Sequence, residues 1–155
     1  MESIPNERFI VLDTAGERER TTLSLRFFGV DLDPDEVTQA LGVKATKSAR
    51  RGEMVRILYT GSLRQQSSWH YTIEDESGTE PEKLILDLLR ALPDDLTVWK
   101  RLTDTSDGSL FCGVFWRTDY GEINLSPECL SVVAERGLRL TFDTYYFGDE
   151  DETGT

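Results

Sequence analysis

A helix is specified from its first residue to its last in the stretch Leu32-Asp33-Pro34-Asp35-Glu36-Val37-Thr38-Gln39-Ala40-Leu41-Gly42. Asp33 can accept hydrogen bonds from the free amides of the first turn, and Pro34 suits the first helical position. Gly42 favours a helix end because glycine readily takes the left-handed conformation. The apolar residues at helical spacing are Val37, Ala40 and Leu41. We therefore predict a helix over residues 33–42 with one buried face.

The segment in front of this helix alternates between apolar and polar residues, with Leu23, Leu25 and Phe27 on one side. Such alternation indicates a strand with one buried face. Further strands are predicted over residues 54–59, 68–74, 96–102, 109–117 and 138–147, and a weaker edge strand over residues 9–12. The turn-forming residues 104–108 separate two of these segments, so we expect residues 96–102 and 109–117 to form an antiparallel pair.

Two more helices are predicted, over residues 81–92 and 126–137, and the second of them repeats the pattern of the first helix. Leu125-Ser126-Pro127-Glu128-Cys129-Leu130 parallels residues 32–37, and both helices end at a glycine that a hydrophobic residue follows. Unrelated helices can reuse the same capping chemistry, or the chain can contain two pseudo-symmetric strand-helix-strand halves. The expected fold is α+β, with a mainly antiparallel sheet of about five to seven strands and about three helices.

The length of 155 residues suits a single domain with one core, which we expect over residues 21–147. A polar segment precedes this core and an acidic tail follows it. The sequence contains no run of about 20 apolar residues and begins without the pattern of a secretory signal, so we expect a cytoplasmic protein without a membrane span. Cys112 and Cys129 are expected to be reduced and buried.

The net charge is −12, from 17 basic and 29 acidic residues. So acidic a chain is repelled by nucleic acids and by anionic membranes, and we expect neither as a partner. Residues 44–56 are a local exception, because they carry +4 and leave −16 on the rest of the chain. The acidity itself fits either simple solubility or attraction to a basic partner.

The sequence favours no enzyme, metal or cofactor. His70 is the only histidine, so sites that need two imidazoles are excluded within one chain. The sequence lacks the common motifs for phosphate loops, dinucleotide turns, zinc hydrolases and serine hydrolases. One histidine is enough for a Cys-His or Ser-His catalytic pair, but an exposed strand position is the simpler expectation for His70.

Several short motifs occur together in a recognisable order. They are Asp33-Pro34-Asp35-Glu36-Val37, Leu41-Gly42-Val43, Thr46 with Ser48, Arg51-Gly52-Glu53, Ser68-Trp69, Leu125-Ser126-Pro127-Glu128 and Gly137-Leu138. In this order and spacing the chain resembles, over residues 21–147, the bacterial family catalogued as domain of unknown function 4279. The resemblance implies a small bacterial α+β domain with no established activity, and some members of the family are suspected immunity proteins that neutralise toxins.

The leading hypothesis is a non-enzymatic binding protein, such as an immunity protein that covers a basic toxin with its acidic surface. The candidate partner-binding residues are Asp31, Asp35, Glu36, Asp104, Asp107 and Tyr120. Aromatic side chains could supply buried anchors, and the candidates are Trp99, Trp116, Tyr120, Tyr145 and Tyr146.

The alternative hypothesis is a domain that binds a small anion, such as a nucleotide or a phosphorylated metabolite, in the basic loop 44–56. The candidate ligand-binding residues are Thr46, Lys47, Ser48, Arg50, Arg51, Gly52 and Trp69. A loop that only neutralises neighbouring acidic surface would explain the same charges. The sequence does not predict an oligomeric state.

Overall fold

A computed structural model describes residues 16–57 and 60–147 of the chain. The strands are β1 (Arg18–Gly29), β2 (Lys47–Ala49), β3 (Met54–Ile57), β4 (Thr60–Leu63), β5 (Ser67–Asp75), β6 (Asp107–Trp116) and β7 (Arg139–Tyr146). The helices are α1 (Pro34–Leu41), α2 (Pro81–Arg90), α3 (Leu96–Thr105) and α4 (Pro127–Glu135). The edge strand predicted at residues 9–12 lies outside the described residues.

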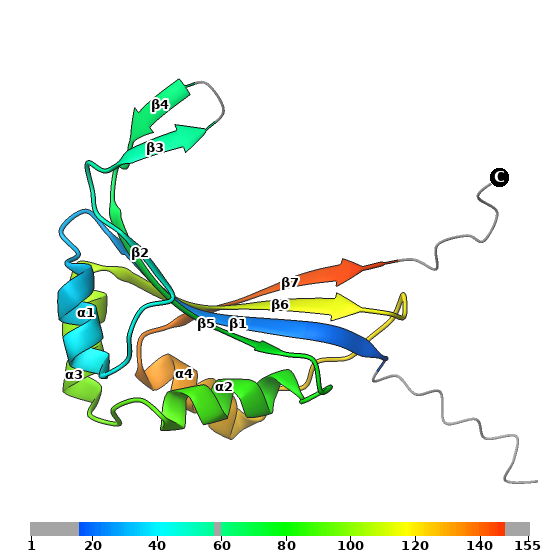
Figure 1. Cartoon of the computed structure of the whole chain (residues 1–155). Helices are drawn as coiled ribbons and strands as arrows, with labels where there is room; N and C mark the ends of the chain where they lie inside the picture. The colour runs from blue at the N-terminus through cyan, green and yellow to red at the C-terminus, as the bar shows by residue number, and fades with distance from the viewer. Residues whose placement is uncertain (1–15, 58–59, 148–155) are drawn as a thin grey trace, which may run out of the picture.

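Five of the strands form one mixed sheet in the order β2-β5-β1-β6-β7. Each neighbouring pair is antiparallel except β6 and β7, which run parallel. The four helices all lie on one face of this sheet, and the separate β3–β4 hairpin projects from the opposite side at one end (Figure 1). The α+β class and the mainly antiparallel sheet are therefore confirmed.

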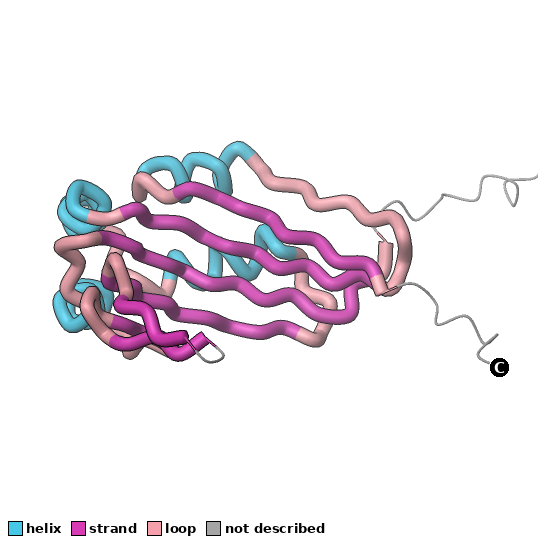
Figure 2. Tube along the Cα trace, turned by 90° about the horizontal axis from the view of Figure 1, so that it is seen from above, coloured by secondary structure: helices cyan, strands magenta, loops and turns pink. Residues whose placement is uncertain are grey.

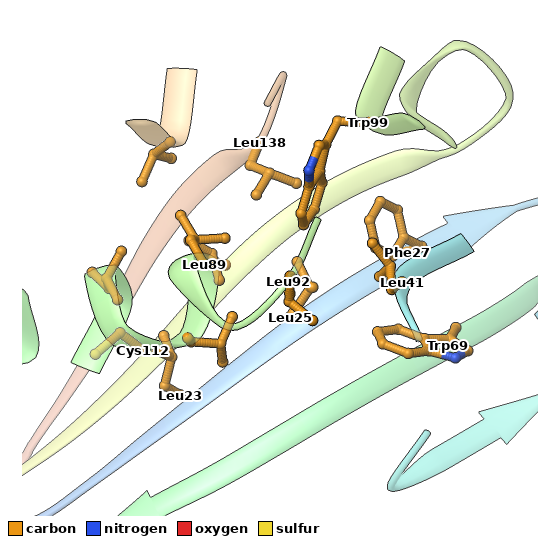
Figure 3. Close-up of a cluster of buried hydrophobic side chains, with 14 of the residues drawn as sticks. Leu23, Leu25, Phe27, Leu41, Trp69, Leu89, Leu92, Trp99, Cys112 and Leu138 are labelled. Atoms are coloured by element: carbon orange, nitrogen blue, oxygen red, sulfur yellow. The ribbon is translucent and has the colours of Figure 1, made fainter. Parts of the chain in front are cut away.

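The hydrophobic core lies between the sheet and the helices. Leu23, Leu25 and Phe27 of β1 are fully buried, as their alternation predicts. The ring of Phe27 lies between two buried tryptophans, with centroids 6.0 Å from Trp69 and 6.5 Å from Trp99 (Figure 3). Burying each such large apolar side chain stabilises the fold by about 1.5–3 kcal/mol. The alternate residues of β1 necessarily point to the other face, which carries no helix.

The repeated capping motifs form as predicted at α1 and α4. Asp33 accepts a hydrogen bond from the Asp35 amide at 3.0 Å, and the Ser126 hydroxyl accepts one from the Cys129 amide at 3.1 Å. The strands around the two helices are arranged differently, because β7 pairs directly with β6 whereas β5 separates β2 from β1. The repetition is thus one of capping chemistry, and the sheet does not divide into two equivalent halves.

The prediction of a strand over residues 96–102 was wrong, because this segment forms α3. The Asp95 carboxylate caps the helix by accepting hydrogen bonds from the amide and the hydroxyl of Thr97. Trp99 and Leu102 are buried at helical spacing. The described chain therefore has four helices rather than three, residues 104–108 are not a hairpin turn, and β6 pairs with β1 instead.

The basic loop is more structured than the sequence predicted. Its residues 47–49 form β2, a short edge strand on β5, and its end enters the β3–β4 hairpin. The strand predicted over residues 54–59 is confirmed as far as residue 57. Cys112 and Cys129 are free and buried, as expected. None of the described helices has the length and apolarity that crossing a membrane requires.

Candidate functional site

Most of the acidic residues predicted to bind a partner gather at one end of the sheet. Because β1 and β6 are antiparallel, the end of β1 meets the start of β6, where Phe28 pairs with Asp107. Helix α1 begins just after β1 and α3 ends just before β6, so both helices bring their acids to this end. The residues gathered there are Asp31, Asp35, Glu36, Asp104 and Asp107.

Tyr120 does not belong to this group. It lies in the loop after β6, where its carbonyl oxygen lies close to Gly16, ahead of the first residue of β1. This loop is at the opposite end of the sheet from the acidic cluster. The structure therefore places Tyr120 apart from the other candidates for partner binding.

The acidic end contains a groove between α1 and α3, which we call the α1–α3 groove. It has a volume of about 460 Å³, and the charged residues that line it are Asp31, Asp33, Glu36 and Arg101. Its other lining residues include Leu32, Val37 and Leu102, which are buried and form an apolar floor. The sequence did not reveal this groove, because one of its walls was predicted to be a strand.

Residues from the two rival predicted sites bind each other. Arg50, a candidate for anion binding, donates a hydrogen bond of 2.6 Å to Asp35, a candidate for partner binding. The same guanidinium lies 3.1 Å from a carboxylate oxygen of Asp33. The basic loop and the acidic end are therefore adjacent, and the charge of Arg50 is already compensated.

Other groups of the predicted anion site are also occupied by the protein itself. The Thr46 hydroxyl donates to the carbonyl of His70, and the amide of Arg51 donates to Ser67. Gly52 donates its amide to the carbonyl of Arg64 at 2.9 Å. The side chains of Lys47, Ser48 and Arg51 remain exposed. The structure does not bring these residues together around one point.

Trp69 is part of the core rather than of the loop surface. Its side chain is fully buried, and its indole nitrogen donates a hydrogen bond of 3.0 Å to the Thr38 hydroxyl of α1. The alternation of Trp69, Tyr71 and Ile73 predicted one common face for them, and this face is the one that the helices cover. Trp69 thus positions α1 on the sheet and offers no ring to a ligand.

His70 points the other way from Trp69 and is half-buried on the helix-free face of the sheet. Burial, as the largest cause, and the positive charges of Arg26, Lys47 and Arg64 together lower its pKa to about 4. The imidazole is therefore neutral at pH 7. The edge of the ring contacts Phe28, with centroids 5.2 Å apart.

The cysteines lie on the opposite side of the sheet from His70. Burial raises the pKa of Cys112 to about 11, and it also raises the pKa of Cys129. A Cys-His nucleophile pair therefore does not form with either thiol. Within residues 16–57 and 60–147, no group of three histidine, cysteine or acidic residues is arranged to hold a metal ion.

The candidate aromatic anchors divide between core and surface. Trp99 and Trp116 are buried, whereas Tyr120, Tyr145 and Tyr146 are exposed. Tyr145 stacks on Phe115, with ring centroids 4.8 Å apart. This pair lies beside an open groove of about 580 Å³ at the end of the sheet remote from the acidic cluster, and the groove's lining includes Arg20, Phe115, Arg117 and Phe147.

A family model described as "Domain of unknown function (DUF4279)" matches residues 19–147. The matched region begins inside β1 and includes every later element through β7. Neither a curated protein nor a solved structure matches the chain.

Proposed function

Since the chain belongs to the DUF4279 family, whose description names no activity, we propose a function from the surfaces of the chain itself. It is a non-enzymatic binding protein whose α1–α3 groove takes a basic segment of a protein partner. A bacterial immunity protein that covers a basic toxin would have this function.

The observation that supports this proposal is the combination of charge and shape in the α1–α3 groove. Asp31 and Glu36 are exposed at its rim, while Leu32, Val37 and Leu102 form an apolar floor. A lysine or arginine side chain has the matching pattern, because its apolar stem packs on hydrophobic surface while its charged end meets carboxylates. The groove is therefore suited to one or two basic side chains of a larger partner.

The charge of the rest of the chain also favours a basic protein partner. The chain carries −12 overall, so its mean field attracts a basic protein over long range. Complementary charge of this kind mainly accelerates the encounter, whereas the buried floor of an interface supplies most of the affinity. Arg101, the basic residue that lines the groove, would select against partners that are uniformly cationic.

The alternative of a small anion in the basic loop has less support. Arg50 is held by Asp33 and Asp35, and Trp69 is buried, so only part of the predicted set is free to bind a ligand. A catalytic role is disfavoured as well, because His70 lies across the sheet from both cysteines.

Charge-neutralising variants of the groove test the proposal. Co-expression with a toxin-like protein from a neighbouring gene should show protection, and purified proteins should bind in calorimetry. The double variant Asp31→Asn with Glu36→Gln should weaken binding by about tenfold or more, since each carboxylate loses a charged hydrogen bond. Its binding should also depend less on salt concentration.

The matched control removes the same charge elsewhere. Glu74 on β5 and Asp119 in the loop after β6 are both exposed and outside the groove. Glu74→Gln with Asp119→Asn should leave the affinity within about twofold, because only the mean field changes. Equal losses in the two double variants would show that the groove is not the binding site. Absence of both binding and protection would remove the immunity function.

A further inference from the structure

A row of side chains crosses the helix-free face of the sheet, in line with the hydrogen bonds between strands. Residues directly opposite each other on neighbouring strands share a face. On this basis Arg26 of β1 pairs with His70 of β5 on one side and with Ser109 of β6 on the other. His70 pairs with Lys47 of β2, and Ser109 pairs with Arg139 of β7. We call Lys47, His70, Arg26, Ser109 and Arg139 the central row; Figure 2 looks onto this face.

A fourth basic residue approaches the central row from outside the sheet. Arg64 follows β4, and the β3–β4 hairpin projects on the same side as the central row (Figure 1). The backbone of Arg64 is fixed, because its amide donates to the carbonyl of Glu53 and its carbonyl accepts from Gly52, both at 2.9 Å. The positive charge of Arg64 contributes to lowering the pKa of His70.

The acids of the chain leave most of this positive charge uncompensated. Arg139 pairs with Asp107 at 3.7 Å. Within the part of the chain that the structure describes, Arg26, Lys47 and Arg64 form no ion pair. Glu53 lies next to Arg64 in the hairpin, but the two side chains form no ion pair among the described residues. On the sheet itself, Glu74 lies four residues beyond His70 along β5 and Asp143 four residues beyond Arg139 along β7, so both are remote from the central row.

Arg26 packs on an aromatic ring, but it forms no ion pair among the described residues and one of its hydrogen-bond donors has no partner there. Its guanidinium lies 4.0 Å from the centroid of the Phe111 ring. Its buried Nε atom has no hydrogen-bond partner among the described residues. A half-buried cation in this state carries a desolvation cost that an anion would offset. Burial accordingly lowers the pKa of Arg26.

We infer that the central row and Arg64 form a binding site for the phosphate group of a small phosphorylated molecule. Arg26, Lys47 and Arg64 supply positive charge and several donors, which match the two charges and three outer oxygens of a phosphate monoester. Neutral His70 and the Ser109 hydroxyl add donors of no net charge. A nucleic acid is disfavoured, because its further phosphates would meet the acidic remainder of the chain. This site is separate from the α1–α3 groove and does not depend on the function proposed for it.

The single histidine makes the site directly observable by NMR. We would follow the imidazole resonances of His70 at pH 6.5 during titration with inorganic phosphate, pyrophosphate and adenosine monophosphate. Adenosine and potassium chloride at matched ionic strength are the controls. The phosphorylated probes should give a saturable shift, and they should raise the pKa of His70 above about 4, because the bound anion offsets the neighbouring cations. The pKa is measured by repeating the titration across pH with the probe at saturation.

Two pairs of substitutions decide whether the effect is local. Lys47→Gln with Arg64→Gln removes two cations at the site, and both positions are accessible enough for the fold to tolerate the change. Lys83→Gln with Arg90→Gln removes the same charge from exposed positions of α2, on the helix side and outside both proposed sites. The first pair should weaken phosphate binding by about tenfold or more and the second by less than about twofold. A shift that does not saturate, or equal losses in both pairs, would overturn the inference.

Discussion

Asp33 and Trp69 each have a role that the sequence predicts and a role that depends on a distant residue. Asp33 caps α1 through the amide of Asp35, which a local motif is enough to predict. It also lies 3.1 Å from Arg50, a contact that arises only because β2 brings the basic loop back beside α1. Trp69 was predicted correctly as a strand residue, but its hydrogen bond to Thr38 makes it part of the core.

At the same scale, His70 shows how its environment sets the properties of a side chain. It was expected on an exposed strand position, and it is half-buried beside Arg26, Lys47 and Arg64. Its pKa is about 4, against an ordinary value of 6.5. Between these two pH values the unfolded chain binds a proton that the folded chain does not, so stability falls as the pH is lowered through this range. Below about pH 4 both states are protonated, and this loss is complete.

A histidine substitution isolates this contribution to pH-dependent stability. We expect the urea midpoint of the wild type to fall more steeply between pH 7 and pH 4 than that of His70→Gln. The carboxylates contribute equally to both proteins, so the difference between the two curves belongs to His70. Chemical denaturation at half-unit steps of pH measures it. Parallel curves would show that the pKa of His70 is the same in the folded and unfolded chains.

At the scale of the elements, the helix that the sequence missed is the most instructive. Residues 96–102 contain threonine, valine and tryptophan, which are common in strands, so the local preference indicated the wrong structure. The cap at Asp95 and the burial of Trp99 and Leu102 against the sheet outweigh that preference. The α1–α3 groove exists because of this helix, and for that reason the sequence could name Asp31 and Glu36 but not the groove that they line.

The glycines that end α1 and α4 differ in a way that a substitution can measure. Gly42 and Gly137 both have positive φ angles, 71° and 68°. An added Cβ at Gly42 would meet no atom within 4 Å, whereas at Gly137 it would meet the Thr103 hydroxyl at 3.1 Å. We expect Gly42→Ala to lower the free energy of unfolding by about 1–2 kcal/mol, the cost of the left-handed conformation. Gly137→Ala should cost more, since the crowding at Thr103 is added.

Urea denaturation of the two alanine variants tests this order. The double variant Gly137→Ala with Thr103→Ala provides the control, with Thr103→Ala alone as its reference. In the double variant, Gly137→Ala should cost about as much as Gly42→Ala does, because the contact atom is gone. A Gly137→Ala cost that stays equal to or below that of Gly42→Ala would contradict the expected crowding.

At the scale of the whole molecule, the charges are sorted by surface. The net charge is −12, and acidic residues line the groove between α1 and α3, while basic residues gather at the centre of the helix-free face. The sequence indicated two alternative binding surfaces, an acidic surface and the basic loop 44–56. In the structure Arg50 joins the loop to the acidic end through its ion pair with Asp35. A separate group of basic residues lies around Arg26, which no local motif identifies.

This charge distribution predicts how stability depends on salt. Raising potassium chloride from 0.01 M to 0.15 M shortens the Debye length from about 30 Å to about 8 Å and screens the repulsion among acidic residues. The exposed ion pairs lose little, because each contributes about 0–1 kcal/mol. We therefore expect the unfolding temperature to rise with salt, as scanning calorimetry would measure. A variant with Glu36→Gln, Asp94→Asn and Asp119→Asn should respond less, and a temperature that falls with salt would contradict the prediction.

The sequence by itself determined the local structure of this protein. The caps of α1 and α4, the buried face of β1 and each short motif of the family pattern depend on residues within about one element of each other. The tertiary structure decided what lies side by side. Strand register places Lys47, His70 and Arg26 in one row, and the packing of α1 and α3 on the sheet forms the acidic groove. Both candidate sites are assembled from distant segments, and the energy that joins these segments is core burial, which the order of residues in one segment does not reveal.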